Sequence, residues 1–437
     1  MRVPAFALAL LLTLPFAPAV QAGTVGDCRV GAYRLAGGRV VDIAPTDGDT
    51  LRWRTFDGET GALHAAADGR WTSTFGWTDR PDGKAATFSC AKGRITFDGR
   101  TGKRIAFNQT ETRFPGRGVD LAGRLVLPKG GGRVPIVVLV HGSERDSARD
   151  FYWLQRMLPA QGIGVFVYDK RGTGGSGGDY SQDFDLLADD AVAAMREARR
   201  LAGSRAGRVG YQGGSQGGWV VPLAANRAPV DFAIISFGLA VTVLEEDQQE
   251  VVLEMTLKGH SPQDIAKALE VARAAEAVIA SGFTSGFDEF DAVRAKYRDE
   301  PWYKDLHGNF TWLLLPYDKA QLIEKGQALK WGTPWTYEPM PTLEASTTPQ
   351  LWALGADDFE APSAMTSDRI RSLQAKGLPF TLAVFPKAEH GLTEYEMKDG
   401  MRVSTRYAPG YLQMMADFIR TGRIGPRYGG AVIDRPN

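Results

Sequence analysis

The sequence predicts an α/β protein in three parts: a small β-rich domain, a mostly parallel sheet flanked by helices, and a helical segment inserted into that sheet. Asp-Gly turns recur between short alternating runs up to about residue 107, as in antiparallel β structure. From residue 108 onward, apolar runs alternate with helical patterns, as in a parallel sheet with crossover helices. Residues 239–345 separate two of these apolar runs and are too long for a connecting loop.

The β-rich domain is predicted at residues 23–107. Its turn signals are Asp47-Gly48, Asp57-Gly58, Asp82-Gly83 and Asp98-Gly99. This spacing predicts an antiparallel meander or a small barrel. The two cysteines of the chain, Cys28 and Cys90, both lie here. In an oxidising compartment we expect them to form a disulfide, which stabilises the fold by roughly 4 kcal/mol on the chain-entropy model.

The α/β core is predicted at residues 108–238 and 346–425. Its short apolar runs are expected to be buried strands. They are Pro135–Val140, Gly164–Tyr168, Arg208–Gln212, Asp231–Ser236, Leu351–Leu354 and Phe380–Phe385. Helices are expected at Leu186–Leu201 and Gly217–Arg227.

The insertion at residues 239–345 is expected to form a helical cap. Its first part, Glu245–Ser281, is strongly helical, and its second part is rich in aromatic residues. Most of these aromatics are expected to form the core of the cap itself, and some could hold an apolar substrate group. They are Trp302, Tyr303, Phe310, Trp312, Tyr317, Trp331, Trp335 and Tyr337.

Residues 1–22 have the features of a signal peptide. Arg2 precedes the apolar stretch Ala5–Phe16, and Val20-Gln21-Ala22 forms a small-residue cleavage site. The apolar stretch is too short for a membrane anchor, and no later stretch is apolar enough to span a bilayer. We therefore expect a periplasmic or secreted protein with no membrane span after cleavage.

Charge and motifs exclude several classes of function. Lys plus Arg equal Asp plus Glu at 51 each, so no long-range field attracts nucleic acid. The chain has neither H-E-x-x-H nor C-x-x-C, and we expect no metal and no cofactor. The dinucleotide-like Gly172-Thr-Gly174-Gly-Ser-Gly177 lacks the helix that should begin at its third glycine.

The motif G-x-S-x-G occurs twice. Around Ser215 it follows a predicted strand and enters a predicted helix, which is the context of a nucleophilic serine. Around Ser176 it also follows a strand but enters a loop. Ser215 is therefore the candidate nucleophile, and Ser176 is expected to lie in a glycine turn.

A nucleophilic serine needs a base and an acid. Of the five histidines, only His390 follows the final predicted strand without another evident role. Asp357 and Asp358 follow the strand before it, with Glu360 as a third carboxylate. The residues alone do not separate Asp357 from Asp358, but either gives the order serine, acid, histidine.

The oxyanion of an acyl-transfer reaction needs backbone N–H donors. One is expected to be the amide of Gln216, directly after the nucleophile. The second is expected to be the amide of Ser143, in the loop after the first core strand. His141 in that loop is expected to be structural.

These motifs together resemble bacterial α/β-hydrolase esterases with an N-terminal β-rich extension and a helical cap. The resemblance covers residues from about 105 to 425 and extends to acyl-peptide hydrolases and serine aminopeptidases. The matching segments are Val138-Val-Leu-Val-His-Gly-Ser143, Tyr168-Asp-Lys-Arg-Gly-Thr-Gly-Gly-Ser176, Gly210-Tyr-Gln-Gly-Gly-Ser-Gln-Gly-Gly218 and Glu389-His-Gly391.

The resemblance favours Asp358 as the acid, because the acid in this group is usually the third residue after a strand-ending Gly, four before a Pro. Gly355 and Pro362 fit that spacing. The group commonly has Gly-His-Ser-x-Gly, whereas this sequence has Gly214 before the serine and Gln216 after it. The substrate preference of the group therefore applies less directly to this protein.

The resemblance implies a serine hydrolase of small acyl esters. A peptidase or amidase acting on short peptides is the first alternative, and Glu245, Glu246 and Asp247 could bind a free amino terminus. A thioesterase or lactonase is a variant of the same chemistry. A non-enzymatic binding protein is the third alternative, although it would be expected to have lost a catalytic residue. The sequence makes no prediction of the oligomeric state.

Overall fold

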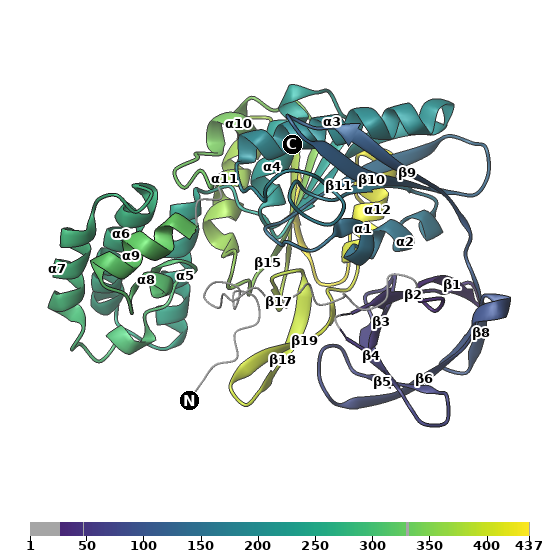
Figure 1. Cartoon of the computed structure of the whole chain (residues 1–437), viewed down its shortest axis with the longest axis horizontal. Coiled ribbons are helices and arrows are strands. Elements are labelled where there is room, and N and C mark those ends of the chain that lie inside the picture. Colours follow the sequence, from purple (N-terminus) through teal and green to yellow (C-terminus); the bar gives the residue numbers. More distant parts are fainter. Residues whose placement is uncertain (1–26, 47, 329–331, 437) are drawn as a thin grey trace. The chain divides into compact units, whose positions relative to one another are not determined.

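A computed structural model describes residues 27–436 except 47 and 329–331 (Figure 1). The predicted signal peptide, residues 1–22, lies outside the described residues. The chain forms two compact units. One ends at Ala106 and also contains Glu394–Tyr407, and the other contains Phe107–Thr393 and the chain from Ala408 onward.

In the first unit, eight strands of the described chain form a closed antiparallel barrel in sequence order, with β8 paired back to β1. The small barrel expected from the Asp-Gly turns is confirmed. Side chains including Trp53, Trp71 and Phe97 fill its interior. The strands are β1 (Gly31–Leu35), β2 (Val40–Pro45), β3 (Leu51–Thr55), β4 (Thr60–Ala65), β5 (Trp71–Thr74), β6 (Pro81–Ser89), β7 (Arg94–Phe97) and β8 (Arg100–Arg104).

The expected disulfide is confirmed. Cys28 and Cys90 are joined, with their Cα atoms 5.6 Å apart. Cys28 precedes β1, and Cys90 begins the short 3₁₀ helix η1 (Cys90–Lys92) after β6. The bond therefore ties the start of the barrel to its sixth strand.

A hairpin from the C-terminal part of the chain packs with the barrel. It consists of β18 (Thr393–Lys398) and β19 (Met401–Tyr407). The Trp77 amide donates to the Ser404 carbonyl at 2.8 Å, and the Tyr407 amide donates to the Gly58 carbonyl at 2.9 Å. The approach requires glycine at Gly76, where a Cβ would lie 2.4 Å from the Thr405 oxygen. We expected this segment in the core, whereas its backbone bonds attach it to the barrel.

In the second unit, nine strands of the described chain form one sheet in the order β20-β16-β15-β14-β13-β11-β12-β10-β9. The strands from β11 to β16 are parallel, and β9, β10 and β20 are antiparallel to their neighbours. The bounds are β9 (Phe107–Pro115), β10 (Asp120–Pro128), β11 (Val134–Val140), β12 (Gly164–Tyr168), β13 (Ala206–Gly214), β14 (Phe232–Ser236), β15 (Gln350–Gly355), β16 (Phe380–Phe385) and β20 (Val432–Asp434). The predicted α/β fold class is confirmed.

Helices cover this sheet and bury a continuous apolar core. The long helix α3 begins after Asp183, whose side chain accepts a hydrogen bond from the Leu186 amide, and it packs beside α4. Such a cap satisfies one of the free amides at a helix N-terminus. The helices are α1 (Ala148–Phe151), α2 (Leu154–Met157), α3 (Phe184–Ala202), α4 (Gly217–Arg227), α11 (Ser363–Ala375) and α12 (Tyr411–Thr421).

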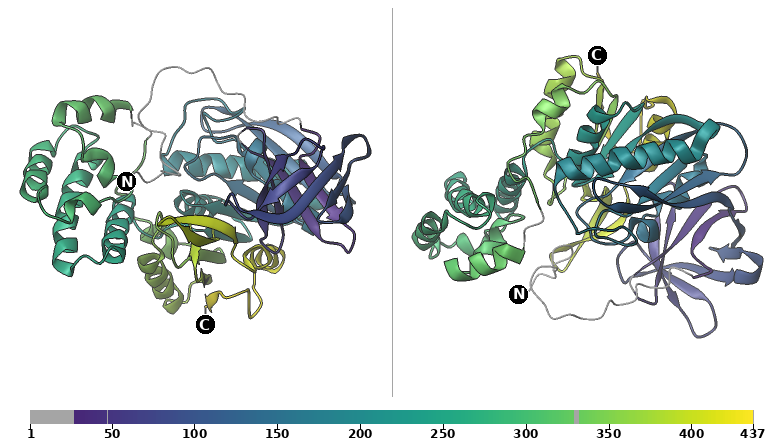
Figure 2. Two further views of the ribbon diagram at one scale, coloured as in Figure 1. Left: turned by 90° about the horizontal axis from the view of Figure 1, so that it is seen from below. Right: turned by 45° about the horizontal axis from the view of Figure 1, so that its top comes forward.

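The insertion forms a helical bundle with its own core (Figure 2). Trp302, Phe310, Tyr317 and Trp335 pack in or against that core, as expected of most of its aromatics, whereas Trp331 lies outside the described residues. Within the described chain, none of the helices combines the length and apolar character needed to cross a bilayer. The helices of the insertion are α5 (Val243–Leu257), α6 (Pro262–Ala280), α7 (Phe287–Tyr297), α8 (Thr311–Leu314), α9 (Lys319–Ala328) and α10 (Met340–Glu344).

Candidate active site

Ser215 lies on a sharp turn between strand β13 and helix α4. Its φ angle is +52°, in the left-handed region that non-glycine residues rarely occupy. The Ser215 amide donates to the Ser236 carbonyl of β14 at 3.1 Å. The turn also needs Gly214, because a Cβ there would lie 2.4 Å from the Phe237 ring. This strained strand-to-helix turn is the geometry that exposes a serine hydroxyl at the end of a sheet.

Asp358 and His390 meet beyond the carboxyl ends of β15 and β16. His390 Nδ1 lies 3.0 Å from Asp358 Oδ2 and 3.2 Å from Oδ1. Asp358 is 1% exposed, and its Oδ1 also accepts the Ala361 amide at 2.8 Å. Asp357 is half-buried, and its amide donates to the Ala388 carbonyl. Of the two aspartates left open by the residues alone, the structure brings Asp358 to the imidazole.

No hydrogen bond joins Ser215 to His390 in the described structure, and the Phe237 ring lies next to both His390 and the residue before Ser215. The Phe237 ring contacts the Gly214 position and lies 4.9 Å from the His390 ring, edge to face. His390 Nε2 lies 3.6 Å from Glu360 Oε2. The imidazole nitrogen that would accept the Ser215 proton, Nε2, therefore faces the Glu360 carboxylate.

The amides expected to bind an oxyanion have no other partner. Within the described residues, neither the Gln216 N–H nor the Ser143 N–H donates a hydrogen bond. Gln216 stands at the N-cap of α4, where the helix dipole also favours negative charge. Ser143 lies in the loop after β11.

The sequence matches the profile of the family described as serine aminopeptidase S33 over residues 133–302. This segment contains the elbow at Ser215, and the sheet order and the turn agree with the match. The chain has the α/β-hydrolase fold, with an N-terminal β-rich extension and a helical insertion, and the match over residues 133–302 supports a hydrolase enzyme.

The hydrolase is also similar to solved structures. Acylaminoacyl peptidase of Pyrococcus horikoshii is 15% identical, with a TM-score of 0.45, and the match covers 88% of this chain and 57% of that one. An esterase of Pyrobaculum calidifontis is 15% identical over 73% of this chain and 87% of that one, with a TM-score of 0.43. An esterase of Pyrococcus furiosus is 14% identical over 65% and 84%, with a TM-score of 0.42. The chain spans less than two thirds of the peptidase.

Carboxylates surround His390 of the hydrolase. Burial by itself would lower the pKa of His390, but Asp358, Glu360 and Glu246 outweigh it and raise this pKa to about 10. Glu246 belongs to helix α5 of the cap and is buried, and burial raises its own pKa well above the ordinary value. The His390 imidazole therefore holds its proton at neutral pH unless one of these charges is compensated.

A buried lysine supports the expected oxyanion site. Lys170 is 2% exposed, and its Nζ donates to the Gly142 carbonyl at 2.7 Å and to Gln216 Oε1 at 3.4 Å. Burial lowers the pKa of Lys170 to about 8, despite the opposing charge of Glu144. The lysine thus joins the loop after β11 to the residue after Ser215. Sequence reasoning missed Lys170, although it stands in the segment Tyr168-Asp-Lys that the family resemblance used.

His141 is structural, as expected. It is 2% exposed, and its Nε2 lies 3.0 Å from the Lys170 amide and 2.9 Å from the Tyr168 carbonyl oxygen. These contacts hold the loop after β11 against the end of β12.

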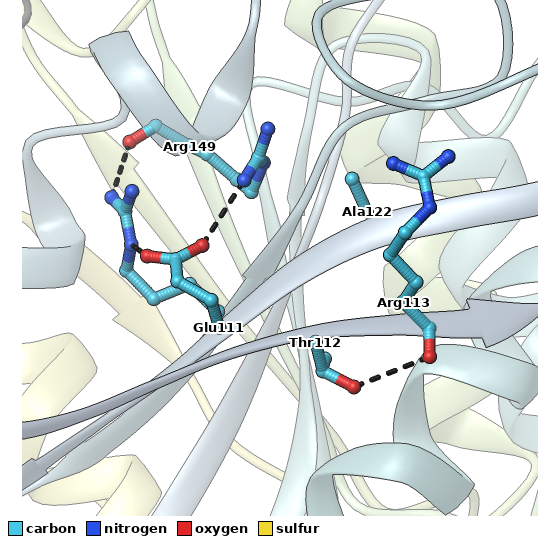
Figure 3. A pocket seen from close by; sticks show the side chains of 6 residues that line it. Glu111, Thr112, Arg113, Ala122 and Arg149 are labelled. Atoms are coloured by element: carbon cyan, nitrogen blue, oxygen red, sulfur yellow. Dashed lines mark hydrogen bonds and ion pairs between the residues drawn. The ribbon is translucent and has the colours of Figure 1, made fainter.

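A surface pocket of about 460 Å³ lies over strands β9 and β10 (Figure 3). Charged side chains line it, and they are paired with one another, as Glu111 is with Arg149 and Arg124. None of the candidate catalytic residues lines this pocket. We therefore assign it no part in the reaction.

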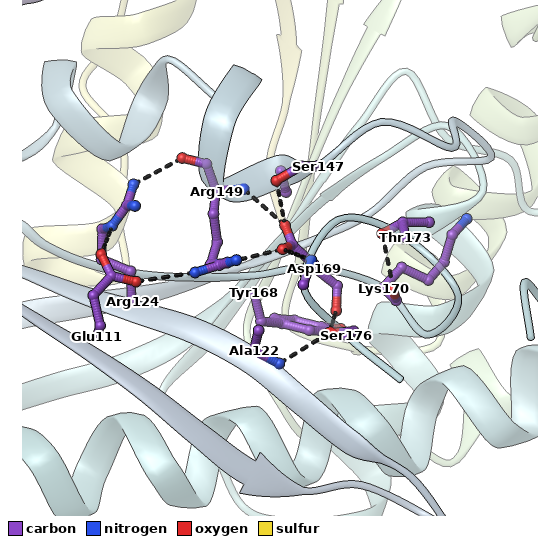
Figure 4. Close-up of polar contacts among 12 residues, drawn as sticks. Glu111, Ala122, Arg124, Ser147, Arg149, Tyr168, Asp169, Lys170, Thr173 and Ser176 are labelled. Carbon is purple, nitrogen blue, oxygen red and sulfur yellow. Dashed lines mark hydrogen bonds and ion pairs between the residues drawn. The ribbon is translucent and has the colours of Figure 1, made fainter. Parts of the chain in front are cut away.

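Ser176, in the second G-x-S-x-G, is held by its own hydrogen bonds (Figure 4). Its hydroxyl donates to the Asp169 carbonyl at 2.6 Å and accepts the Ala122 amide at 2.9 Å. Asp169 is buried and binds Arg149 and Ser147, which fixes the turn. Ser176 therefore joins β10 to the segment after β12, and its hydroxyl is not free.

Proposed function

We propose that the hydrolase cleaves carboxylic esters of small acyl groups through an acyl-Ser215 intermediate. The observation that carries the proposal is the strained Ser215 turn beside the Asp358–His390 pair, all beyond the carboxyl ends of the parallel strands. Sites in open α/β sheets form at those ends.

In the proposed reaction, Ser215 Oγ attacks the ester carbonyl carbon while His390 Nε2 accepts the hydroxyl proton. The Gln216 and Ser143 amides, with the Lys170 ammonium behind them, bind the oxygen that becomes negative. Collapse of the tetrahedral intermediate expels the alcohol, which takes the proton from His390. Water then attacks the acyl carbon in the same way, releasing the acid and restoring Ser215.

Catalysis requires His390 to be neutral and its Nε2 to face Ser215. In the described structure Nε2 lies beside Glu360 instead. Catalytic hydrogen bonds are often long without substrate and shorten in the complex. We expect substrate binding to turn the imidazole from Glu360 toward Ser215.

The carboxylates around His390 support a second candidate, an amidase or peptidase for substrates with a free amine. Glu360 is half-exposed beside His390 Nε2, and Glu246 lies in electrostatic reach from the cap. An ammonium group between them would compensate their charge and lower the pKa of His390 toward the range of a useful base. Thioester hydrolysis is a variant of the ester reaction.

A substrate panel tests the two candidates. The purified protein is assayed with p-nitrophenyl acyl esters of increasing length and with aminoacyl p-nitroanilides, with and without a free amine. Cleavage of the esters alone supports the esterase. Preference for anilides with a free amine supports the peptidase. Failure of Ser215 to react with a fluorophosphonate, together with no cleavage, would favour the binding protein.

We also propose that the protein is exported to the periplasm or beyond the cell. The Cys28–Cys90 disulfide supports this, since such bonds persist in oxidising compartments. Fractionation of cells expressing the full chain, with N-terminal sequencing of the product, tests the cleavage after Ala22.

A further inference from the structure

We propose that the cap binds a divalent transition-metal ion such as Zn²⁺ through Glu250, Glu254 and His307. Glu250 and Glu254 are one turn apart on helix α5, and His307 comes from the segment between η4 (Tyr303–Asp305) and helix α8. One ligand atom from each residue lies within 4.8 Å of the other two. The proposal is independent of the reaction at Ser215.

The three residues hold buried polar atoms without hydrogen-bond partners. They are Glu250 Oε2, Glu254 Oε2 and His307 Nδ1. The Glu250 side chain is only 8% exposed, so water does not readily replace the missing partner. A buried carboxylate oxygen without a partner costs stability, and in a native structure it calls for an explanation such as an ion. Here three residues with such atoms lie together, each with a ligand atom within 4.8 Å of the other two.

The neighbouring Asp247 shows how the same helix satisfies a buried carboxylate without an ion. Its oxygens accept the Phe310 and Thr311 amides and the Thr311 hydroxyl, at 2.5 to 3.1 Å. Asp247 lies one turn before Glu250, and the segment it binds begins just after His307. The chain thus supplies donors to both oxygens of Asp247, whereas Glu250 Oε2 and Glu254 Oε2 have no donor among the described residues.

The spacing fits a small cation with short bonds. His307 Nδ1 lies 3.6 Å from Glu254 Oε2 and 3.9 Å from Glu250 Oε1. Tetrahedral ligands about 2.0–2.1 Å from zinc lie about 3.3 Å from one another, so ligand atoms that lie within 4.8 Å of one another would have to approach by at most about 1.5 Å to close the site. One imidazole with two carboxylates suits zinc and its neighbours, whereas calcium and magnesium prefer oxygen ligands alone.

His307 lies at the solvent-facing side of the cluster. Its side chain is 45% exposed although its Nδ1 is buried. The imidazole stacks on Trp312, with ring centres 5.0 Å apart, which fixes the ring plane. Lys258 is within electrostatic reach of Glu254 and His307, and its Nζ also donates to the Asp305 carbonyl at 2.8 Å. A bound ion would join α5 to the segment leading into α8.

Zinc titration of tag-free, chelator-treated full-length protein tests the site. Isothermal titration calorimetry is expected to show one Zn²⁺ per chain, and Co²⁺ is expected to give visible absorption bands of a low-symmetry site. Thermal unfolding should shift to higher temperature with Zn²⁺, because an ion that binds only the folded state stabilises it. Ca²⁺ and Mg²⁺ at equal concentration should not produce the shift.

The variants Glu254→Gln and His307→Ala are each expected to weaken Zn²⁺ binding at least about tenfold and to abolish the thermal shift. His260→Ala is the matched control, because it removes another cap histidine that is already paired with Asp305 at 3.0 Å. Glu254→Gln keeps the side-chain shape, so its circular dichroism should match the wild type. The proposal is overturned if the wild type does not bind Zn²⁺ stoichiometrically, or if both ligand variants bind Zn²⁺ as tightly as the wild type does.

Discussion

The two G-x-S-x-G segments show that the same short motif can serve opposite purposes in one protein. Ser215 has a φ of +52°, and its hydroxyl makes no hydrogen bond in the described chain. Ser176 lies in a relaxed glycine turn, and its hydroxyl binds two backbone groups. The two serines differ in the structure of the chain directly after them. Helix α4 begins two residues after Ser215, whereas Ser176 leads into a loop.

The difference between Ser215 and Ser176 is tested first by removing each hydroxyl in turn and measuring the activity. Ser215→Ala is expected to lower kcat on the best panel substrate by about 10⁴ to 10⁶, because the nucleophile is lost, with thermal unfolding unchanged. Ser176→Ala, the matched control, should retain kcat within a few-fold of wild type. Substantial turnover by Ser215→Ala would remove Ser215 from the mechanism.

The two adjacent aspartates give a second comparison. Asp358→Asn is expected to lower kcat by about 10⁴, because an amide cannot orient and stabilise the imidazolium as the carboxylate does. Asp357→Asn should lower it by less than about tenfold, because the carboxylate placed at His390 Nδ1 is that of Asp358. Steady-state kinetics decide, and equal losses in the two variants would show that the acid is misassigned.

The free energy of unfolding should distinguish the two serines in the opposite way, with the larger loss on replacement of Ser176. Ser176→Ala is expected to lower the free energy of unfolding by about 1–3 kcal/mol, because the Ala122 amide and the Asp169 carbonyl lose their shared partner. Urea unfolding followed by circular dichroism measures the loss. An unchanged midpoint would mean that the Ser176 bonds do not hold the turn.

The smallest expected effect concerns Glu360, the carboxylate beside His390 Nε2, and the pH dependence of the reaction. A base must be neutral, so kcat/KM should rise with pH through the pKa of His390, which nearby carboxylates raise to about 10. Glu360→Gln removes one of those charges, and the rising limb should move to lower pH by up to about one unit, since the Glu360 side chain is half-exposed. Superimposable profiles would contradict this.

The matched control for that profile is Glu289→Gln, which alters an exposed carboxylate on helix α7. Its pH profile should coincide with that of the wild type. Asp358 and Glu246 also face His390 and remain in both variants, so the rising limb should stay above the ordinary range of a histidine.

The sequence predicted the features that depend on local pattern. The parallel strands, the helix after Ser215 and the cap followed from apolar periodicity, and the barrel followed from its Asp-Gly turns. Strands β9, β10 and β20 were not predicted. Strands β9 and β20 lie at the two edges of the sheet, where no long apolar run is needed, and Gly123 and Arg124 interrupt the apolar run of β10.

The parts of the site that the sequence missed depend on contacts between distant segments. Phe237, between Gly214 and His390, carries no motif, and its φ of +42° is set by the fold. Glu360 was considered only as an acid, although it faces the other imidazole nitrogen. His307 lies more than fifty residues from Glu254, so no metal-ligand spacing could be recognised.

The hairpin of β18 and β19 has a consequence for how this architecture can be altered. The chain leaves the hydrolase core three residues after His390, contributes two strands to the barrel unit, and returns at Ala408. The barrel unit is therefore not encoded by one continuous segment of the chain. Deletion of the N-terminal barrel strands would leave the β18–β19 hairpin, which follows His390 closely in the chain, without its backbone hydrogen bonds to Gly58 and Trp77. Exchange of this unit between relatives must therefore transfer two separate stretches of the gene together.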